Sequence, residues 1–203
     1  MIIYYTENFK GGLAESRRLL EKSIAEYTGD ADRAGELVSG LKTGENGKPY
    51  IEGFDRFSVS HTGGIWAVLI DIYECGLDIQ LGRKCDPLAM SRRIYAEEDA
   101  EMTAALYDED PEKAKDLFFR FWARREALTK ALGSTVFDAY LPSVQAEDVS
   151  VNGAAYRICD IYFPDAGFDD GEKLYAAICV ENDEETQGIP LTLQPVYIRL
   201  NEG

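Results

Sequence analysis

A chain of 203 residues that is 45% hydrophobic and 29% charged can bury a sizeable core and still solvate its surface. Its formal net charge of −16 argues against a nucleic-acid partner, because binding to phosphate backbones needs a basic surface. The residues before Glu7 contain neither a basic leader nor a small-residue cleavage site, and no later stretch approaches the length that spans a bilayer. The sequence therefore predicts a soluble, cytoplasmic protein with no membrane partner.

The four cysteines lie far apart and form no CxxC pair, at Cys75, Cys85, Cys159 and Cys179. The single histidine, His61, cannot complete a Cys/His zinc site with partners so widely spaced. We expect reduced thiols.

The first third of the chain predicts a strand over residues 2–5, a helix over 13–27 and a second short helix after Asp30. Residues 40–49 are rich in glycine and end in proline, so we expect a loop there. This loop presents Lys48 immediately before the next apolar segment, and loops of this kind can approach a ligand closely.

Two apolar segments around Thr62-Gly63-Gly64 predict a hairpin with His61 at its turn. In the following strand, Asp78 and Gln80 alternate with apolar residues, so both polar side chains point to one face.

Residues 85–107 predict two short helices, and a longer helix begins at Pro111 after the N-cap Asp110 and ends before Gly133. Asn152-Gly153 predicts a second hairpin, and strands follow over 174–180 and 196–200. Mixed rather than alternating strands and helices favour an α+β fold with antiparallel sheets.

On the long helix, Trp122, Glu126 and Lys130 form a row at the edge of the apolar stripe, where Trp122 would wall a cleft. An ordinary surface ion pair explains the same spacing of Glu126 and Lys130. Arginine doublets such as Arg124-Arg125 are interpreted as solvated helix faces.

The oxygen atoms of Asp78, Gln80 and Glu126 are ligands of the kind that Mg²⁺ accepts. A metal held there could bridge a pyrophosphate, with Lys48, His61 and Lys130 as further contacts. The alternatives remain open at this level, because a lone histidine is often structural and an aspartate can simply cap a turn.

Four motifs occur in a characteristic order: GKPY at residues 47–50, FSVSHTGG at 57–64, GLDIQ at 76–80 and FWARREALTKALG at 121–133. Together they resemble the 4′-phosphopantetheinyl transferase superfamily. Its signature is a G-[VIL]-D strand and a downstream W-x-x-K-E-[AS]-x-x-K helix, and the upstream G-K-P and S-H segments resemble its surfactin-synthetase-activating branch.

The resemblance implies a monomeric pseudo-dimer of two similar α+β halves, residues 1–75 with coenzyme A contacts and 76–203 with the Mg²⁺ and catalytic residues. It implies that the phosphopantetheine arm of coenzyme A is moved to a serine of an acyl or peptidyl carrier protein, with release of adenosine 3′,5′-bisphosphate.

The resemblance also implies the roles of single residues. Asp78, Glu126 and Lys130 would be catalytic; Asp78 and Glu126, with Gln80, would hold Mg²⁺; and Glu126 would take the serine proton, directly or through water. Coenzyme A would contact Arg17 at the 3′-phosphate, Gly47, Lys48 and Pro49 at the nucleotide, and Ser60, His61 and Lys130 at the phosphates.

Two positions depart from the family pattern. Gln80 stands where the surfactin type usually has a metal-binding glutamate, although its carbonyl oxygen can still serve. Arg125 replaces the lysine of the helix motif, which keeps the charge but exchanges a compact ammonium for a planar fork.

The carrier proteins of this family are typically acidic, so an acidic enzyme needs a local basic surface to attract them. We expect docking on the segment 82–95, at Arg83, Lys84, Arg92 and Arg93; an ordinary solvated helix explains the same pattern. The alternatives are a catalytically weak or inactive homologue that binds coenzyme A or the carrier, and an unrelated Mg²⁺-dependent phosphohydrolase.

Overall fold

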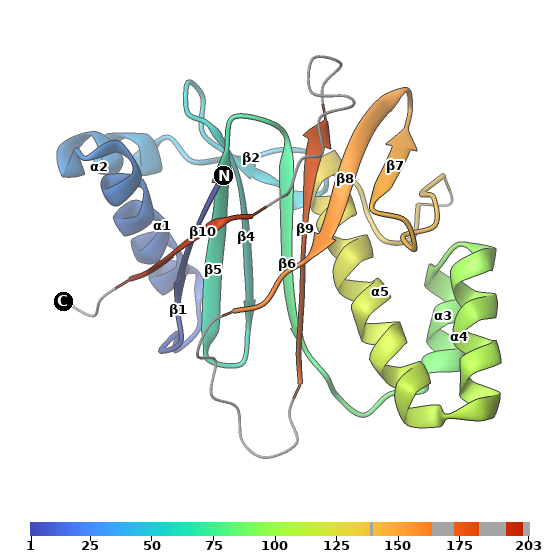
Figure 1. The fold of residues 1–203 in the computed structure, drawn as a ribbon. Helices are drawn as coiled ribbons and strands as arrows, with labels where there is room; N and C mark the ends of the chain where they lie inside the picture. Colours follow the sequence, from blue (N-terminus) through green and yellow to red (C-terminus); the bar gives the residue numbers. More distant parts are fainter. Residues whose placement is uncertain (139, 164–172, 183–193, 201–203) are drawn as a thin grey trace.

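The computed structural model of the protein describes residues 1–138, 140–163, 173–182 and 194–200. Two four-stranded sheets pack against each other through a shared apolar core, and helices cover the outer face of each sheet (Figure 1). The predicted mixture of helices with largely antiparallel sheets is confirmed. Of the helices described, none has the length and apolar character needed to cross a membrane.

The first sheet has the strand order β10-β1-β5-β4. Its strands are β1 (Ile2–Thr6), β4 (Arg56–Thr62), β5 (Ile65–Asp71) and β10 (Val196–Arg199). The predicted hairpin is β4–β5, and β1 pairs antiparallel with β5, whereas β10 pairs parallel with β1. The strand β10, from the C-terminal part of the chain, therefore belongs to the sheet that the N-terminal strands form. The division into two halves between residues 75 and 76 stays a prediction.

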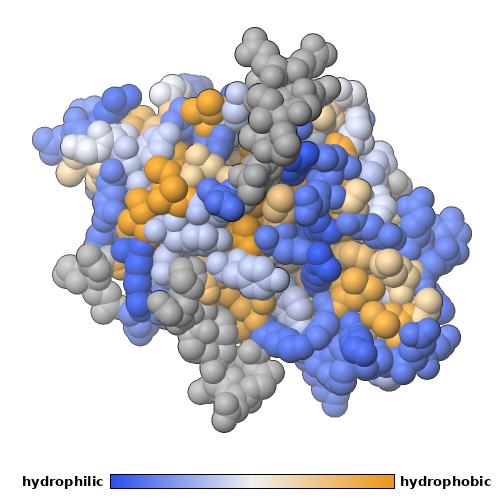
Figure 2. Space-filling model, in the orientation of Figure 1, coloured by the Kyte–Doolittle hydropathy of each residue, from blue (hydrophilic) through white to orange (hydrophobic). Residues whose placement is uncertain are grey.

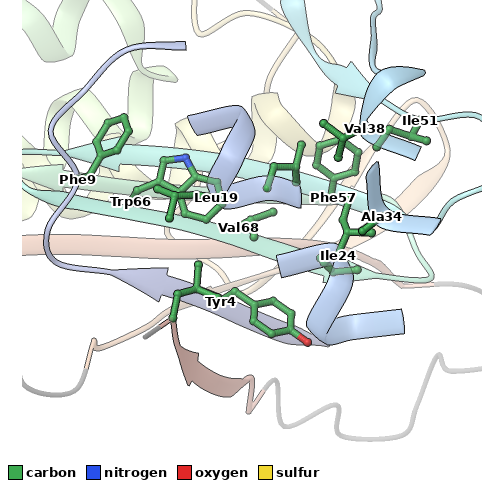
Figure 3. Packing of buried hydrophobic residues seen from close by; sticks show 13 residues of the cluster. Tyr4, Phe9, Leu19, Ile24, Ala34, Val38, Ile51, Phe57, Trp66 and Val68 are labelled. Atoms are coloured by element: carbon green, nitrogen blue, oxygen red, sulfur yellow. The ribbon is translucent and has the colours of Figure 1, made fainter. Parts of the chain in front are cut away.

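The predicted helices α1 (Leu13–Thr28) and α2 (Ala31–Ser39) cover the outer face of this sheet. Side chains alternate along β1, so that Tyr4 packs under the helices (Figure 3). Ile3, its neighbour in the chain, packs in the core shared with the second sheet. Trp66 on β5 is fully buried in the same helix-covered core.

The expected loop at 40–49 contains a small two-stranded sheet of β2 (Lys42–Thr43) and β3 (Pro49–Tyr50) around the 3₁₀ turn η1 (Glu45–Gly47). Asn46 and Gly47 have φ values of 56° and 85° in this turn, and the Gly44 amide donates to the carbonyl oxygen of Lys48 at 2.8 Å, which closes the reversal.

The second sheet has the order β6-β9-β8-β7 and is antiparallel throughout. Its strands are β6 (Cys75–Leu81), β7 (Asp148–Val151), β8 (Ala154–Asp160) and β9 (Leu174–Asn182). Asn152 and Gly153 have φ values of 53° and 86° in the turn between β7 and β8. Positive φ at both turn residues is what Asn-Gly favours, so the predicted hairpin is confirmed.

The helix α5 (Pro111–Leu132) packs on this second sheet, and α3 (Pro87–Ile94) and α4 (Glu97–Glu109) pack on the other side of α5 (Figure 1). The Asp110 side chain accepts hydrogen bonds from two backbone N–H groups of the first turn of α5, which explains where the helix begins. The surface over α4 and α5 is largely hydrophilic around a hydrophobic area (Figure 2).

Candidate active site

A cleft of about 430 Å³ lies where the loop before β3, the strand β4, the end of α5 and the following segment meet. Its walls come from four segments of the chain. The lining residues are Asn46, Gly47, Lys48, Pro49, Phe57, Ser58, Val59, Glu126, Thr129, Lys130, Gly133, Ser134, Thr135, Val136 and Phe137. A neighbouring cavity of about 330 Å³ shares Lys48, Pro49, Phe57 and Gly133 with it. Residues of three motifs that are far apart in the sequence, GKPY, FSVSHTGG and FWARREALTKALG, therefore line one cleft.

Gly76 allows α5 to lie directly on β6. A Cβ atom at this position would lie 1.9 Å from the carbonyl oxygen of Ala127 and 2.6 Å from the amide nitrogen of Ala131. These two alanines are almost fully buried, so at Gly76 the helix presents its backbone and methyl groups to the strand. The close packing brings Glu126 and Lys130 of α5 near Asp78 of β6.

Lys130 and Asp78 form an ion pair at the centre of the site. The Lys130 Nζ lies 2.7 Å from Asp78 Oδ1, 3.0 Å from Ser60 Oγ and 3.0 Å from the carbonyl oxygen of Leu77. Asp78 is only 6% exposed, and a buried carboxylate needs such compensation. The ion pair of Glu126 with Lys130 that helical spacing suggested is not among the ion pairs of the described residues, since Lys130 pairs with Asp78 of another element instead.

The second oxygen of Asp78, Oδ2, is buried and has no hydrogen-bond partner among the described residues. Burial raises the pKa of Glu126, the charge of Asp78 raises it further, and Lys130 opposes the rise. The two carboxylates therefore lie close enough to repel each other, which a cation between them would relieve.

A magnesium ion fits this donor set in part. Within the described part of the chain, no three His, Cys, Asp or Glu side chains gather closely enough to hold a metal by themselves. The site instead offers the free oxygen of Asp78 and the carboxylate of Glu126, and Mg²⁺ commonly uses one or two carboxylates together with water and substrate phosphates. Gln80, the third predicted ligand, donates its amide N–H to the carbonyl oxygen of Leu81 at 2.6 Å.

The Lys48 side chain links the loop before β3 to Glu74 and to the end of α5. Its Nζ lies 2.6 Å from Glu74 Oε2 and donates to the carbonyl oxygen of Ala131 at 2.7 Å, at the end of α5. Asn46 donates to the carbonyl oxygen of Gly133 at 2.9 Å, so the loop is tied to the helix end at two places. Gly47 and Pro49 line the cleft as its neighbours.

Arg17 and His61 lie outside this group, and neither is one of the described residues that line the cleft. The guanidinium of Arg17 donates to the carbonyl oxygen of Val38 at 3.0 Å, which links α1 to α2. His61 is exposed near the end of β4, with its ring centroid 5.1 Å from that of Phe9. Their roles at the phosphates stay predictions.

The interpretation of Arg124 and Arg125 as a solvated doublet is wrong, since they are 3% and 4% exposed. Arg124 donates to the carbonyl oxygens of Val144 and Gln145 at 2.8 and 2.9 Å, and Arg125 donates to that of Val136 at 3.2 Å. They thereby hold the segment after α5, part of which walls the cleft.

The signal for this burial was present in the sequence: Arg124 and Arg125 follow Phe121 by three and four residues and therefore lie on the apolar stripe of the helix.

Trp122 does not wall the cleft as expected. It packs with Phe118, at 6.2 Å between ring centroids, in the cluster under α3. Along this row of the helix, Trp122 meets the ring of Phe118 one turn earlier, whereas Lys130 meets β6 two turns later.

Comparison with known proteins agrees with the site. The family model described as "4′-phosphopantetheinyl transferase superfamily" matches residues 74–179, about half of the chain, which include Asp78, Glu126 and Lys130. Two curated relatives, from Salmonella typhi and Salmonella typhimurium, are both described as 4′-phosphopantetheinyl transferase AcpT. Each is 34% identical over 110 residues, which cover 49% of this chain and 55% of the relative. The chain thus spans about half the length of the curated relatives that it matches.

Proposed function

The chain belongs to the 4′-phosphopantetheinyl transferase superfamily, and we propose that it transfers the 4′-phosphopantetheine group of coenzyme A to a serine of an apo acyl or peptidyl carrier protein. The observation that carries the proposal is the cluster of Asp78, Glu126 and Lys130 at a cleft, inside the segment that the family matches. The names of the two relatives support the same reaction.

Coenzyme A would lie in the cleft with its nucleotide along Gly47, Lys48 and Pro49. Lys48 lines the cleft there, and its ammonium, which is paired with Glu74 in the structure, would contact the nucleotide phosphates. Contacts of Arg17 with the 3′-phosphate and of His61 with the phosphates require the ligand to extend beyond these walls.

A magnesium ion would be held by Asp78 and Glu126, with the carbonyl oxygen of Gln80 as a third donor once the amide turns. Bound there, it would neutralise the charge of the pyrophosphate and of the departing nucleotide.

The chain's own groups account for the proton transfer and the charge. The carrier serine oxygen bonds to the β-phosphorus, the bond from that phosphorus to the bridging oxygen breaks, and adenosine 3′,5′-bisphosphate leaves with the electron pair. Glu126 accepts the serine proton, directly or through a water molecule. Lys130 faces the same cleft and stabilises the negative charge of the leaving group.

The carrier would dock beside α3, at Arg83, Lys84, Arg92 and Arg93. The Arg93 guanidinium carbon lies 5.9 Å from the ring centroid of Phe137, and Phe137 lines the cleft. The basic end of α3 therefore borders the cleft mouth, where an acidic partner can present its serine.

Three finer points belong to the same proposal. The G-K-P and S-H segments favour the surfactin-synthetase-activating branch. Two four-stranded sheets, each covered by helices, are compatible with a monomeric pseudo-dimer. We place the reaction in the cytoplasm, where coenzyme A and carrier proteins would meet the enzyme.

The test is incubation of the protein with coenzyme A, Mg²⁺ and a panel of apo carrier proteins, followed by mass spectrometry of each carrier. A mass gain of one phosphopantetheine, absent with Asp78→Ala, is the expected result. Binding of coenzyme A without transfer to any carrier would favour the inactive homologue, and phosphate release from simple nucleotides would favour a phosphohydrolase.

A further inference from the structure

Three side-chain hydroxyls of β4 accept hydrogen bonds from backbone amides of β6, as carbonyl oxygens do between the strands of one sheet. The amides of Leu77, Ile79 and Leu81 donate to Ser58 Oγ, Ser60 Oγ and Thr62 Oγ1 at 3.0, 3.1 and 3.2 Å. The two strands run in the same direction and join the two sheets through this row. Ser60 differs from Thr62 because its hydroxyl also contacts the polar groups of the site.

The hydrogen-bonding capacity of the Ser60 hydroxyl is filled within the protein. A hydroxyl has two acceptor positions and one hydrogen. Ser60 Oγ accepts from the Ile79 amide at 3.1 Å and from Lys130 Nζ at 3.0 Å, so its hydrogen is left for Asp78 Oδ1 at 3.1 Å. With a residue exposure of 5%, it has little access to another partner.

Lys130 is saturated in the same way. Its three N–H donors reach Asp78 Oδ1, Ser60 Oγ and the Leu77 carbonyl oxygen. Both donors to Asp78 therefore meet at one carboxylate oxygen, while Oδ2 stays buried without a hydrogen-bond partner among the described residues. This unequal use of the two oxygens fixes the rotation of the carboxylate.

We propose that Ser60 is a positioning residue that directs the Oδ2 atom of Asp78 toward the bound cation. The Ser60 hydroxyl is held to the backbone of β6, whereas Lys130 alone is a long side chain that could follow either carboxylate oxygen. This differs from the phosphate contact that the family resemblance implies for Ser60. The inference rests on the proposed function, since it concerns the same site.

The test compares Ser60→Ala with Thr62→Val by titrating Mn²⁺ into each purified protein and by thermal unfolding. Each variant removes one hydroxyl that binds a β6 amide, but Thr62 does not touch Asp78 or Lys130 in the contacts described. Loss of a residue that orients a metal ligand weakens metal affinity by about 10–100-fold. We expect this loss for Ser60→Ala, affinity within about twofold of wild type for Thr62→Val, and recovery in Ser60→Thr, which keeps the hydroxyl.

Several outcomes would overturn the inference. One is that Ser60→Ala and Thr62→Val bind Mn²⁺ with equal affinity. Another is that the wild-type protein binds no Mn²⁺. A third is that Ser60→Ala lowers only the affinity for coenzyme A, measured without metal. Ser60→Cys, which keeps the shape with a weakly bonding thiol, supplies the same comparison if the alanine variant does not fold. Transfer to apo carriers by wild type is measured in parallel: its absence refutes the proposed function, while the Mn²⁺ titration still decides the role of Ser60.

Discussion

Replacing Gly76 with alanine tests whether the backbone contact between β6 and α5 assembles the site. The new Cβ would lie 1.9 Å from the Ala127 oxygen, where ordinary contact begins near 3.4 Å, so strand and helix must separate by roughly 1.5 Å. Such a shift carries Lys130 Nζ away from Asp78 Oδ1, which lies 2.7 Å from it in the wild-type protein. Overpacking of this kind costs about 1–3 kcal/mol or more, which is roughly 2–12 °C in Tm for a chain of this size. A misplacement of about 1 Å can lower a rate by about 10²-fold.

The assay pairs thermal unfolding with transfer to an apo carrier, and Gly35→Ala serves as the control. Gly35 lies inside α2, where a Cβ would meet nothing nearer than Glu21 Oε1 at 3.6 Å. This control should therefore gain about 0.5–1 kcal/mol from the better helix former and keep its activity. If Gly76→Ala unfolds at the wild-type temperature and transfers at the wild-type rate, the close approach of α5 to β6 does not hold the site together.

Three further predictions concern other parts of the site. Without divalent metal, Glu126→Gln should stabilise the protein near neutral pH, because the pKa of Glu126 is raised and its contribution to stability is therefore present in acid and lost as the pH rises through that pKa. Urea unfolding should show that the advantage of the variant grows as the pH rises above about 4.3, the ordinary pKa of a glutamate. Arg125→Lys should cost about 1.5–3 kcal/mol in chemical denaturation, although it restores the family's motif lysine, since an ammonium cannot reproduce the guanidinium bond to Val136; unchanged stability would contradict this. Reversal of Arg92 and Arg93 to Glu should raise the KM for the carrier and leave coenzyme A affinity unchanged, and an unaltered KM in the folded variant would place docking elsewhere.

Local patterns in the sequence predicted most elements of the fold. The N-cap Asp110, the apolar period and the glycine after Leu132 predicted α5 almost to the residue, because helix ends depend on nearby backbone groups. The Asn152-Gly153 turn was predicted for the same reason: it depends on the φ values of two adjacent residues. The meeting of Asp78 with Lys130 followed from the family resemblance, not from spacing, since the two residues are 52 positions apart.

Neighbouring residues in the chain are enough to specify the helices, the hairpins and the residue types at the site. The partners that these residues contact depend on how the elements pack: Lys48 pairs with Glu74, the buried Arg125 bonds to the segment after α5, and β10 pairs with β1. The packing also places the Ser60 hydroxyl within hydrogen-bond distance of Ile79, Asp78 and Lys130. Such contacts join groups from different elements, so their geometry exists only once the two sheets have packed and Gly76 has let α5 approach.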